Sequence, residues 1–182
     1  MHYRLKLLPI VLNILALILF NCDKDDKSPT GPDNDKQTLS CRIDVLGDLD
    51  FSDDVGSQYG KNIERNGKFY NLIWCRGDAK LNDKTIYLVF QLWSTSEINS
   101  NLQFNIASSD MSSNKGFWLH VVHYPDGSVT YELESGTLKL ESFNAEAKTA
   151  SGVFTGSGHT GNNQSFTLTN GKFTLKNMQT IG

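Results

Sequence analysis

The chain of 182 residues is poor in cysteine and proline, with three and four residues of these types. Three cysteines exclude a mini-protein scaffold that depends on several disulfides. With 38% hydrophobic residues and so little proline, the composition also excludes a disordered or collagen-like chain. An excess of positive charge is lacking too, because 17 Lys and Arg stand against 20 Asp and Glu. At a net charge of −3 we expect no nucleic-acid-binding surface.

The longest apolar run of the sequence is too short to span a membrane. Residues 7–20 form this run, which follows a short basic segment and is interrupted by Pro9 and Asn13. A membrane-spanning helix needs roughly 20 apolar residues. The pattern therefore predicts a secretory signal peptide over residues 1–21, with an uncleaved signal anchor as the alternative.

The signal segment ends in Leu19-Phe20-Asn21-Cys22, which resembles a bacterial lipobox. In that motif a signal peptidase cleaves before the cysteine, and acyl chains such as palmitate are attached to the chain there. The resemblance implies a lipoprotein anchored through Cys22, each buried CH₂ contributing ~0.8 kcal/mol. The signal holds two of the 17 basic residues, so a processed chain has a net charge of −5. We therefore expect lipid, and not charge, to hold the protein to a membrane.

A polar segment follows the lipobox. Residues 23–36 contain no apolar side chain and combine proline, glycine and alternating charge, so we expect a flexible acidic tether over residues 22–38. Its start, Cys22-Asp23-Lys24-Asp25-Asp26, resembles the export signal of surface lipoproteins in the Bacteroidota. The resemblance implies a protein of the outer membrane that is displayed at the cell surface. A generic polar linker is the alternative.

Residues 39–179 show the alternation of β-strands and no sustained helical period. Residues 101–106 alternate polar and apolar side chains, and the even-numbered residues from Ile86 to Leu92 share one face of another expected strand. Turn residues separate such runs at short intervals. The sequence therefore predicts a single all-β domain, an antiparallel β-sandwich of about eight to ten strands.

Part of this domain resembles known proteins. Residues 136–143 and 152–156, together with residues 169–173, are similar to the C-terminal half of small β-rich Bacteroidota lipoproteins of unknown function. The resemblance supports the fold and the cell-envelope location. It carries no catalytic residues over to this chain.

Two turns can be examined for register. The segment 124–128 predicts a three-residue Pro-Asp-Gly turn, which places His123 opposite Val129 and leaves one apolar face. A two-residue turn would instead bury Glu132 and Glu134 beside aliphatic side chains, at several kcal/mol per unpaired charge.

The second turn is Asn170-Gly171, which would close a hairpin that pairs Leu168 with Phe173. One long strand with a bulge at Gly171 is the alternative.

Two cysteines besides Cys22 are expected to point into the core. Alternation places Cys41 on the face of Ile43, and Cys75 on the face of Ile73. In an oxidising compartment a Cys41–Cys75 disulfide is predicted, and it would stabilise the fold by ~3–4 kcal/mol. Two separate buried thiols are the alternative.

The predicted Pro-Asp-Gly register defines a candidate ligand site. Trp118, His120 and Tyr124 would lie on the outward face, with Glu134 opposite Trp118 and Glu132 opposite His120. Aromatic rings next to carboxylates are suited to holding a sugar ring. We therefore hypothesise a carbohydrate-binding face, although the same face could instead be packed under another segment.

The function class follows from what this site lacks. Because no second carboxylate or nucleophile accompanies His120 and Glu132, we expect a binding or structural domain and not an enzyme. An accessory of a glycan-active enzyme is a less favoured reading. Another is a domain that binds an envelope protein through a sheet edge.

Acidic side chains crowd one loop, at Asp48, Asp50, Asp53 and Asp54. Oxygen ligands at this density can hold calcium, although the glycine and glutamate of an EF-hand loop are missing. A solvated acidic turn is the alternative, and no other cofactor is expected.

Overall fold

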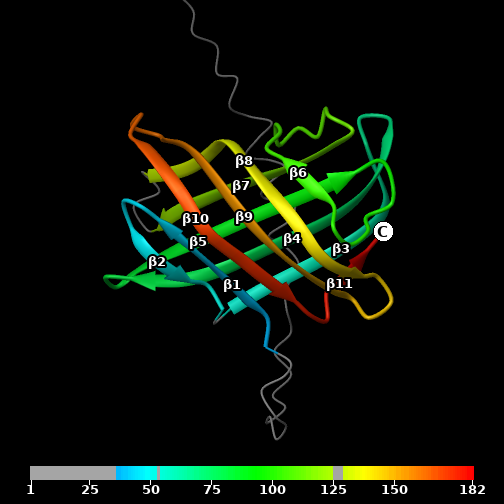
Figure 1. The fold of residues 1–182 in the computed structure, drawn as a ribbon, viewed down its shortest axis with the longest axis horizontal. Coiled ribbons are helices and arrows are strands. Elements are labelled where there is room, and N and C mark those ends of the chain that lie inside the picture. The colour runs from blue at the N-terminus through cyan, green and yellow to red at the C-terminus, as the bar shows by residue number, and fades with distance from the viewer. Residues whose placement is uncertain (1–35, 53, 125–128) are drawn as a thin grey trace, which may run out of the picture. The chain divides into compact units, whose positions relative to one another are not determined.

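The computed structural model describes residues 36–52, 54–124 and 129–182. The regular secondary structure of these residues consists of β-strands alone (Figure 1). The prediction of an all-β domain is therefore confirmed. The described strands are β1 (Thr38–Ile43), β2 (Gly47–Asp50), β3 (Asp54–Arg65), β4 (Lys68–Leu81), β5 (Lys84–Ser94), β6 (Gln103–Asn105), β7 (Lys115–Tyr124), β8 (Val129–Asn144), β9 (Thr149–Thr160), β10 (Ser165–Leu175) and β11 (Gln179–Ile181).

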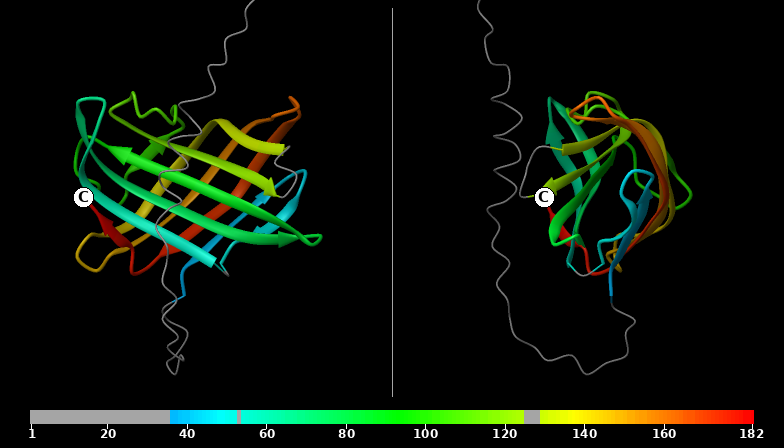
Figure 2. Two further views of the ribbon diagram at one scale, coloured as in Figure 1. Left: turned by 180° about the vertical axis from the view of Figure 1, so that it is seen from behind. Right: turned by 90° about the vertical axis from the view of Figure 1, so that its left-hand side faces the viewer.

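The strands form one continuous sheet in the order β11-β3-β4-β5-β7-β8-β9-β10-β1-β2, with β6 paired to β8. From β3 to β10 neighbours in the sheet are antiparallel and, apart from β6, follow one another in the sequence, as short turns favour. The β1–β2 hairpin extends one end, and β11 runs parallel to β3 at the other. A sandwich of two separate sheets is not confirmed, because this single sheet curls strongly around its own inner face (Figure 2).

Bulges and glycines explain the curl. The β8–β9 pairing shifts register between Leu133 and Ser135 and again between Leu140 and Ser142. Gly136 lies between these shifts with φ +155, and a Cβ on it would lie 2.4 Å from the carbonyl oxygen of Thr155. Since bulges bend a strand and raise its twist, and glycine permits close backbone approach, β8 can wrap around the core.

Side-chain hydrogen bonds and one backbone bridge tie the two ends of the sheet together. The Gln37 Nε2, next to β1, donates a 3.0 Å hydrogen bond to the carbonyl oxygen of Val55 on β3. The Ser57 hydroxyl donates to Gln37 Oε1 at 2.6 Å, and Ser52 forms an isolated bridge with Asp78 of β4. These contacts hold the curled sheet around one large apolar core.

The core includes both cysteines of the domain. Cys41 is 4% exposed and Cys75 is fully buried, and both are free thiols, so the predicted Cys41–Cys75 disulfide is not formed. They lie on β1 and β4, which are not neighbours in the sheet, and each packs as a small hydrophobic group. Burial raises the pKa of Cys41 to about 12 and also raises the pKa of Cys75, which keeps both thiols protonated.

The register of one predicted turn is confirmed and that of the other is wrong. His123 pairs with Val129 and His120 with Glu132, as the three-residue turn requires; the turn residues 125–128 themselves lie outside the described residues. Residues 165–175 form the single strand β10, so the Asn170-Gly171 hairpin is not formed and the alternative, a bulge, is found. A Cβ on Gly171 would lie 2.4 Å from the Phe154 ring, which accounts for glycine there.

The predictions made for residues 1–35, including the signal peptide, Cys22 and most of the tether, lie outside the described residues and stay predictions. Within the described part of the chain no helix has the length and apolar character needed to cross a membrane.

Candidate functional site

The outward side of β4, β5 and β7 carries a row of large side chains that remain partly exposed. Trp74, Gln91 and Trp118 pair in register across the three strands. Arg76, Val89 and His120 form the next row. We call these six residues the outer face. They point outward because they alternate with core residues along each strand.

A loop covers one end of the outer face. The Tyr70 hydroxyl donates to the carbonyl oxygen of Met111 at 2.7 Å, and the Trp93 indole donates to that of Ser113 at 3.2 Å. Tyr70, Trp93 and Met111 are thereby buried in a second apolar cluster on this side of the sheet. Gly116, the partner of Trp93 in the β5–β7 pairing, leaves space for the indole ring, since a Cβ there would lie 3.0 Å from it. The alternative of packing under another segment is therefore correct for this end of the face.

Trp118 and His120 form the centre of the outer face. Their rings meet edge to face with centroids 4.2 Å apart. The Trp118 Nε1 is buried and has no hydrogen-bond acceptor within the described part of the protein. Burial lowers the pKa of His120 to about 4, so the imidazole is neutral at pH 7. The centre of the face is therefore aromatic and uncharged.

The structure brings together only part of the predicted ligand set. Glu132 lies opposite His120 as expected, and its side chain is exposed. Glu134 does not lie opposite Trp118, because the β7–β8 pairing ends at His120 and Glu132, and β6 pairs with the later part of β8. Tyr124 ends β7, and its side chain lies outside the described part of the structure.

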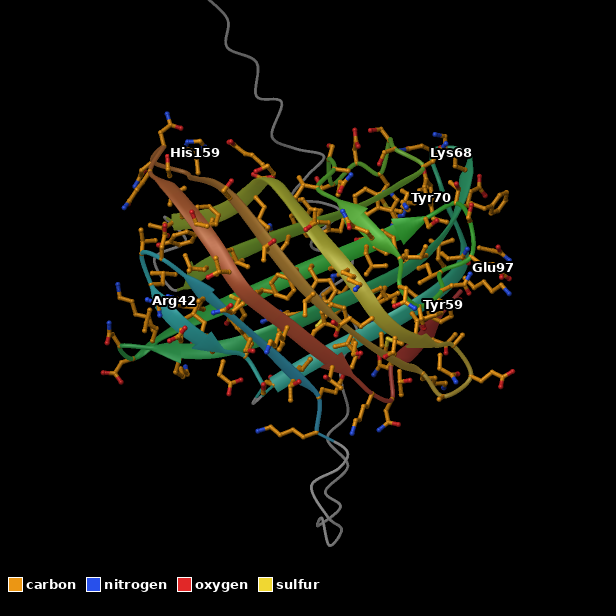
Figure 3. The ribbon with its side chains drawn as sticks, in the orientation of Figure 1. Arg42, Tyr59, Lys68, Tyr70, Glu97 and His159 are labelled. Carbon is orange, nitrogen blue, oxygen red and sulfur yellow. The ribbon has the colours of Figure 1, made fainter. Side chains whose placement is uncertain are left out.

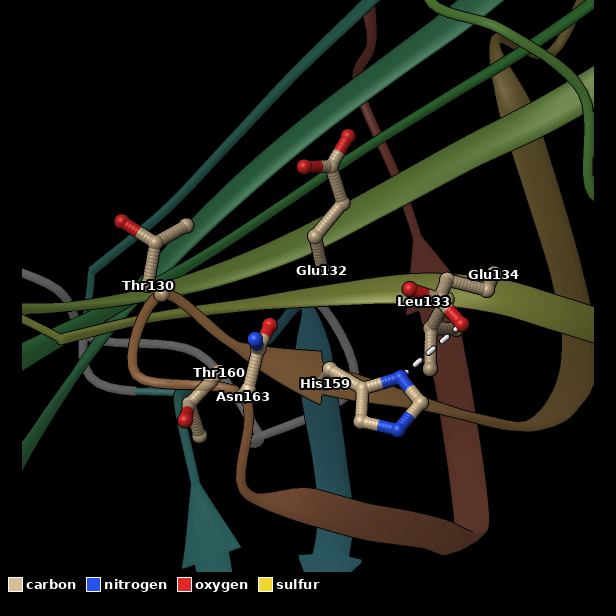
Figure 4. A pocket seen from close by; sticks show the side chains of 8 residues that line it. Thr130, Glu132, Leu133, Glu134, His159, Thr160 and Asn163 are labelled. Atoms are coloured by element: carbon tan, nitrogen blue, oxygen red, sulfur yellow. Dashed lines mark hydrogen bonds and ion pairs between the residues drawn. The ribbon is translucent and has the colours of Figure 1, made fainter.

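Glu134 instead belongs to a shallow pocket of about 280 Å³ between the ends of β8 and β9 (Figure 4). The His159 Nδ1 donates a 2.9 Å hydrogen bond to the Glu134 carboxylate, and both side chains are largely exposed. Glu132 also lines the pocket, but its carboxylate points away from this pair in Figure 4. The pocket can therefore offer hydrogen bonds to a polar ligand, but the two carboxylates do not converge.

The acidic loop is engaged with protein partners. Asp48 forms a 3.1 Å ion pair with Arg42, and Asp50 accepts a 2.9 Å hydrogen bond from the Ser52 backbone N–H. Hydrogen bonds from Ser52 lower the pKa of Asp50. Asp54 begins β3, and Asp53 lies outside the described residues. No group of three His, Cys, Asp or Glu side chains that could hold a metal ion occurs among the residues described, so the calcium hypothesis gains no support.

The sequence analysis missed Trp74 and Gln91 as members of the face. The alternation of Tyr70, Leu72 and Trp74 along β4 was a usable signal for one of them. Their meeting with Trp118 depends on β4, β5 and β7 being neighbours, which alternation alone does not specify.

Comparisons with models of protein families, with curated proteins and with solved structures give no match for this chain.

Proposed function

We propose that this protein is an exported cell-envelope lipoprotein, anchored in the outer membrane through lipid on Cys22, whose β-domain is a non-enzymatic binding module. The lipobox-like residues 19–22 and the polar tether that follows them support the anchor. The first strand, β1, begins at Thr38, the last residue of the predicted tether, which would allow the domain to stand away from the membrane surface.

We infer that the outer face is the binding surface and that it contacts carbohydrate. The observation that carries this proposal is the row Trp74-Gln91-Trp118, in which two partly exposed indoles flank one amide. The Gln91 Nε2 already donates a 3.1 Å hydrogen bond to the Met111 sulfur, which fixes the amide in place. Large apolar side chains are otherwise mostly buried in the described domain. Indole rings pack against the C–H faces of sugars, and an amide oxygen can accept hydrogen bonds from hydroxyls.

A binding role is favoured over a catalytic one by the arrangement of the titratable groups. The neutral His120 lies opposite the exposed Glu132, whereas Glu134 is hydrogen-bonded to His159 in the separate shallow pocket. General acid–base hydrolysis of a glycoside needs two carboxyl groups on either side of one bond. The carboxylates here are not placed in that way.

Binding is tested on a glycan array with the full-length chain. Trp118→Ala and Trp74→Ala should each weaken binding by about tenfold, because a lost aromatic contact costs roughly 0.5–1.5 kcal/mol beyond its area. Phe69→Ala is the matched control, since Phe69 is a 60% exposed aromatic on the other side of β4. Equal binding by all three variants would show that the outer face is not the site.

The anchor is tested by labelling producing cells with radioactive palmitate. The wild-type chain and Cys41→Ala should carry the label, and Cys22→Ala should not. Label retained by Cys22→Ala would refute the proposed lipidation site without bearing on the outer face.

A further inference from the structure

A second pocket, of about 340 Å³, lies at the end of the domain opposite His159 (Figure 3). Four segments form it: β3, β4, the chain that follows β5, and the turn between β8 and β9. Their lining residues are Tyr59 and Lys61, Asn71, residues 97–99, and residues 143–146, of which the first two end β8. The volume is at the lower end of the roughly 300–1,000 Å³ range of small-molecule sites. None of these residues was predicted from the sequence to form a site.

The deepest polar residue of this pocket has an unmet hydrogen-bonding need. Asn71 is only 7% exposed, and its Nδ2 donates a 3.0 Å hydrogen bond to the carbonyl oxygen of Ser96. Its Oδ1 is buried and has no donor among the described residues. An unsatisfied buried polar group costs about 1–3 kcal/mol, so a ligand donor that meets this oxygen when the amide turns toward the pocket would recover that cost.

A bulge in β3 helps to form the site. The β3–β4 pairing passes from Gly60–Leu72 to Ile63–Tyr70, so that two β3 residues face Asn71 without pairing with it. Asn62, one of the two, has φ +57, in the left-handed region. Bulges of this kind interrupt pairing and redirect side chains next to binding sites.

The walls of the pocket are aromatic and well fixed. The Tyr59 and Phe143 rings meet edge to face with centroids 5.1 Å apart. The Phe143 N–H donates a 3.0 Å hydrogen bond to the Ser100 hydroxyl, which holds the end of β8 in place. Burial, and then the charge of Glu97, raise the pKa of Tyr59. Figure 3 shows Tyr59 and Glu97 at the same end of the domain.

The chemistry of the pocket selects the kind of ligand. The buried atom that lacks a hydrogen-bond partner, Asn71 Oδ1, is a neutral acceptor, which matches a hydroxyl or amide donor. The charged groups Lys61, Glu97 and Glu146 are exposed, and in water they would contribute little to holding an ion. A compact ring with several hydroxyls and an apolar face uses both the acceptor and the aromatic walls.

We propose that this pocket is a second binding site, which takes a single sugar ring or the end of a sugar chain, with the Asn71 amide turning toward the pocket so that a ring hydroxyl donates to its Oδ1, and with the apolar ring face against Phe143. This pocket shares no residue with the outer face, so the proposal holds even if carbohydrate binding at the outer face is disproved.

The test is a titration of the ¹⁵N-labelled full-length chain with glucose, galactose, mannose and N-acetylglucosamine, each alone at millimolar concentration. At least one sugar should give saturable shifts at the amides of residues 59–61, 71, 97–99 and 143–146. Asn71→Leu, which keeps the side-chain size and removes the acceptor, should weaken this binding at least tenfold. Phe143→Leu should also weaken sugar binding. Phe143 is partly exposed, so this substitution is less critical for folding.

Matched controls separate this site from the others. Trp118→Ala alters the outer face and Glu134→Gln alters the shallow pocket, and neither should change the affinity. The proposal is overturned if no sugar shifts the pocket amides. It is equally overturned if binding persists at full strength in both Asn71→Leu and Phe143→Leu, or if only Trp118→Ala abolishes it.

Discussion

The two faces of β4, β5 and β7 are formed by alternate residues of the same strands, yet they differ sharply. Toward the inside, Ile73 on β4, Phe90 on β5 and Leu119 on β7 are fully buried. Toward the outside, Trp74, Gln91 and Trp118 occupy neighbouring positions and remain partly exposed. The inner face is uniformly apolar, whereas the outer face mixes indole, amide, imidazole and guanidinium groups.

This difference shows that the fold restricts the side chains of the inner face more than those of the outer face. An inner side chain must fill its space without a polar atom, because the core is packed as densely as a crystal. The loop that carries Met111 meets the same demand at one end of the outer face, where it buries Tyr70 and Trp93. Trp74 and Trp118 pack against the edge of this second apolar cluster and are only partly buried by it, and the part of each indole that stays exposed is the part informative about binding.

The largest effect should come from truncating the inner face. Phe90 is fully buried against the rings of Phe154 and Phe173, so Phe90→Ala should lower the free energy of unfolding by about 3–5 kcal/mol. Its neighbour on the outer face provides the control, because Gln91→Ala should cost under about 1 kcal/mol. Urea denaturation of the full-length chain measures both. Similar losses in the two variants would mean that the faces are not energetically distinct.

A smaller effect concerns the one outer-face group whose burial changes its titration. The pKa of His120 is about 4 in the folded protein against 6.5 for the free side chain, so the unfolded chain binds more protons between these values. The contribution of His120 is therefore complete above pH 6.5 and is lost as the pH falls through about 4. At 1.36 kcal/mol per unit it amounts to at most about 3 kcal/mol.

His120→Gln isolates this contribution, because other acidic groups titrate equally in both proteins. The difference in unfolding free energy between wild type and variant should shrink or reverse from pH 7 to pH 4. A difference that stays constant over this range would show that His120 is solvated and that the outer face is more open than its geometry indicates.

Alternation was sufficient to predict the all-β class and the inner residues of β5, because a buried strand face leaves a period of two in the sequence. The Pro-Asp-Gly register followed from the cost of burying Glu132. The Asn170-Gly171 hairpin was wrong for a physical reason, since Asn-Gly suits a bulge with a left-handed residue as well as it suits a tight turn. Asn170 has φ +53 within the continuous strand β10.

The candidate sites were less accessible to such reasoning. His120 opposite Glu132 required only one local register, and it was predicted. The Trp74-Gln91-Trp118 row and the pocket around Asn71 require strands and turns that are distant in sequence to become neighbours. The buried Asn71 looks in the sequence like any other polar residue of a strand, and only its position opposite the β3 bulge makes it distinctive.

The smallest expected effect comes from a valine-to-threonine substitution on each face. It gives the sharpest comparison, because the substitution replaces one methyl group by a hydroxyl of nearly the same size. Val121 is fully buried on β7, so Val121→Thr places a hydroxyl in the core and should cost about 1–3 kcal/mol. Val89 is partly exposed on the neighbouring strand β5, where the hydroxyl of Val89→Thr can reach water, and we expect a change within about 0.5 kcal/mol. Thermal unfolding of both variants under one set of conditions measures the difference. An equal cost at Val89 would mean that a part of this molecule, or a bound partner, covers the outer face and keeps water from it.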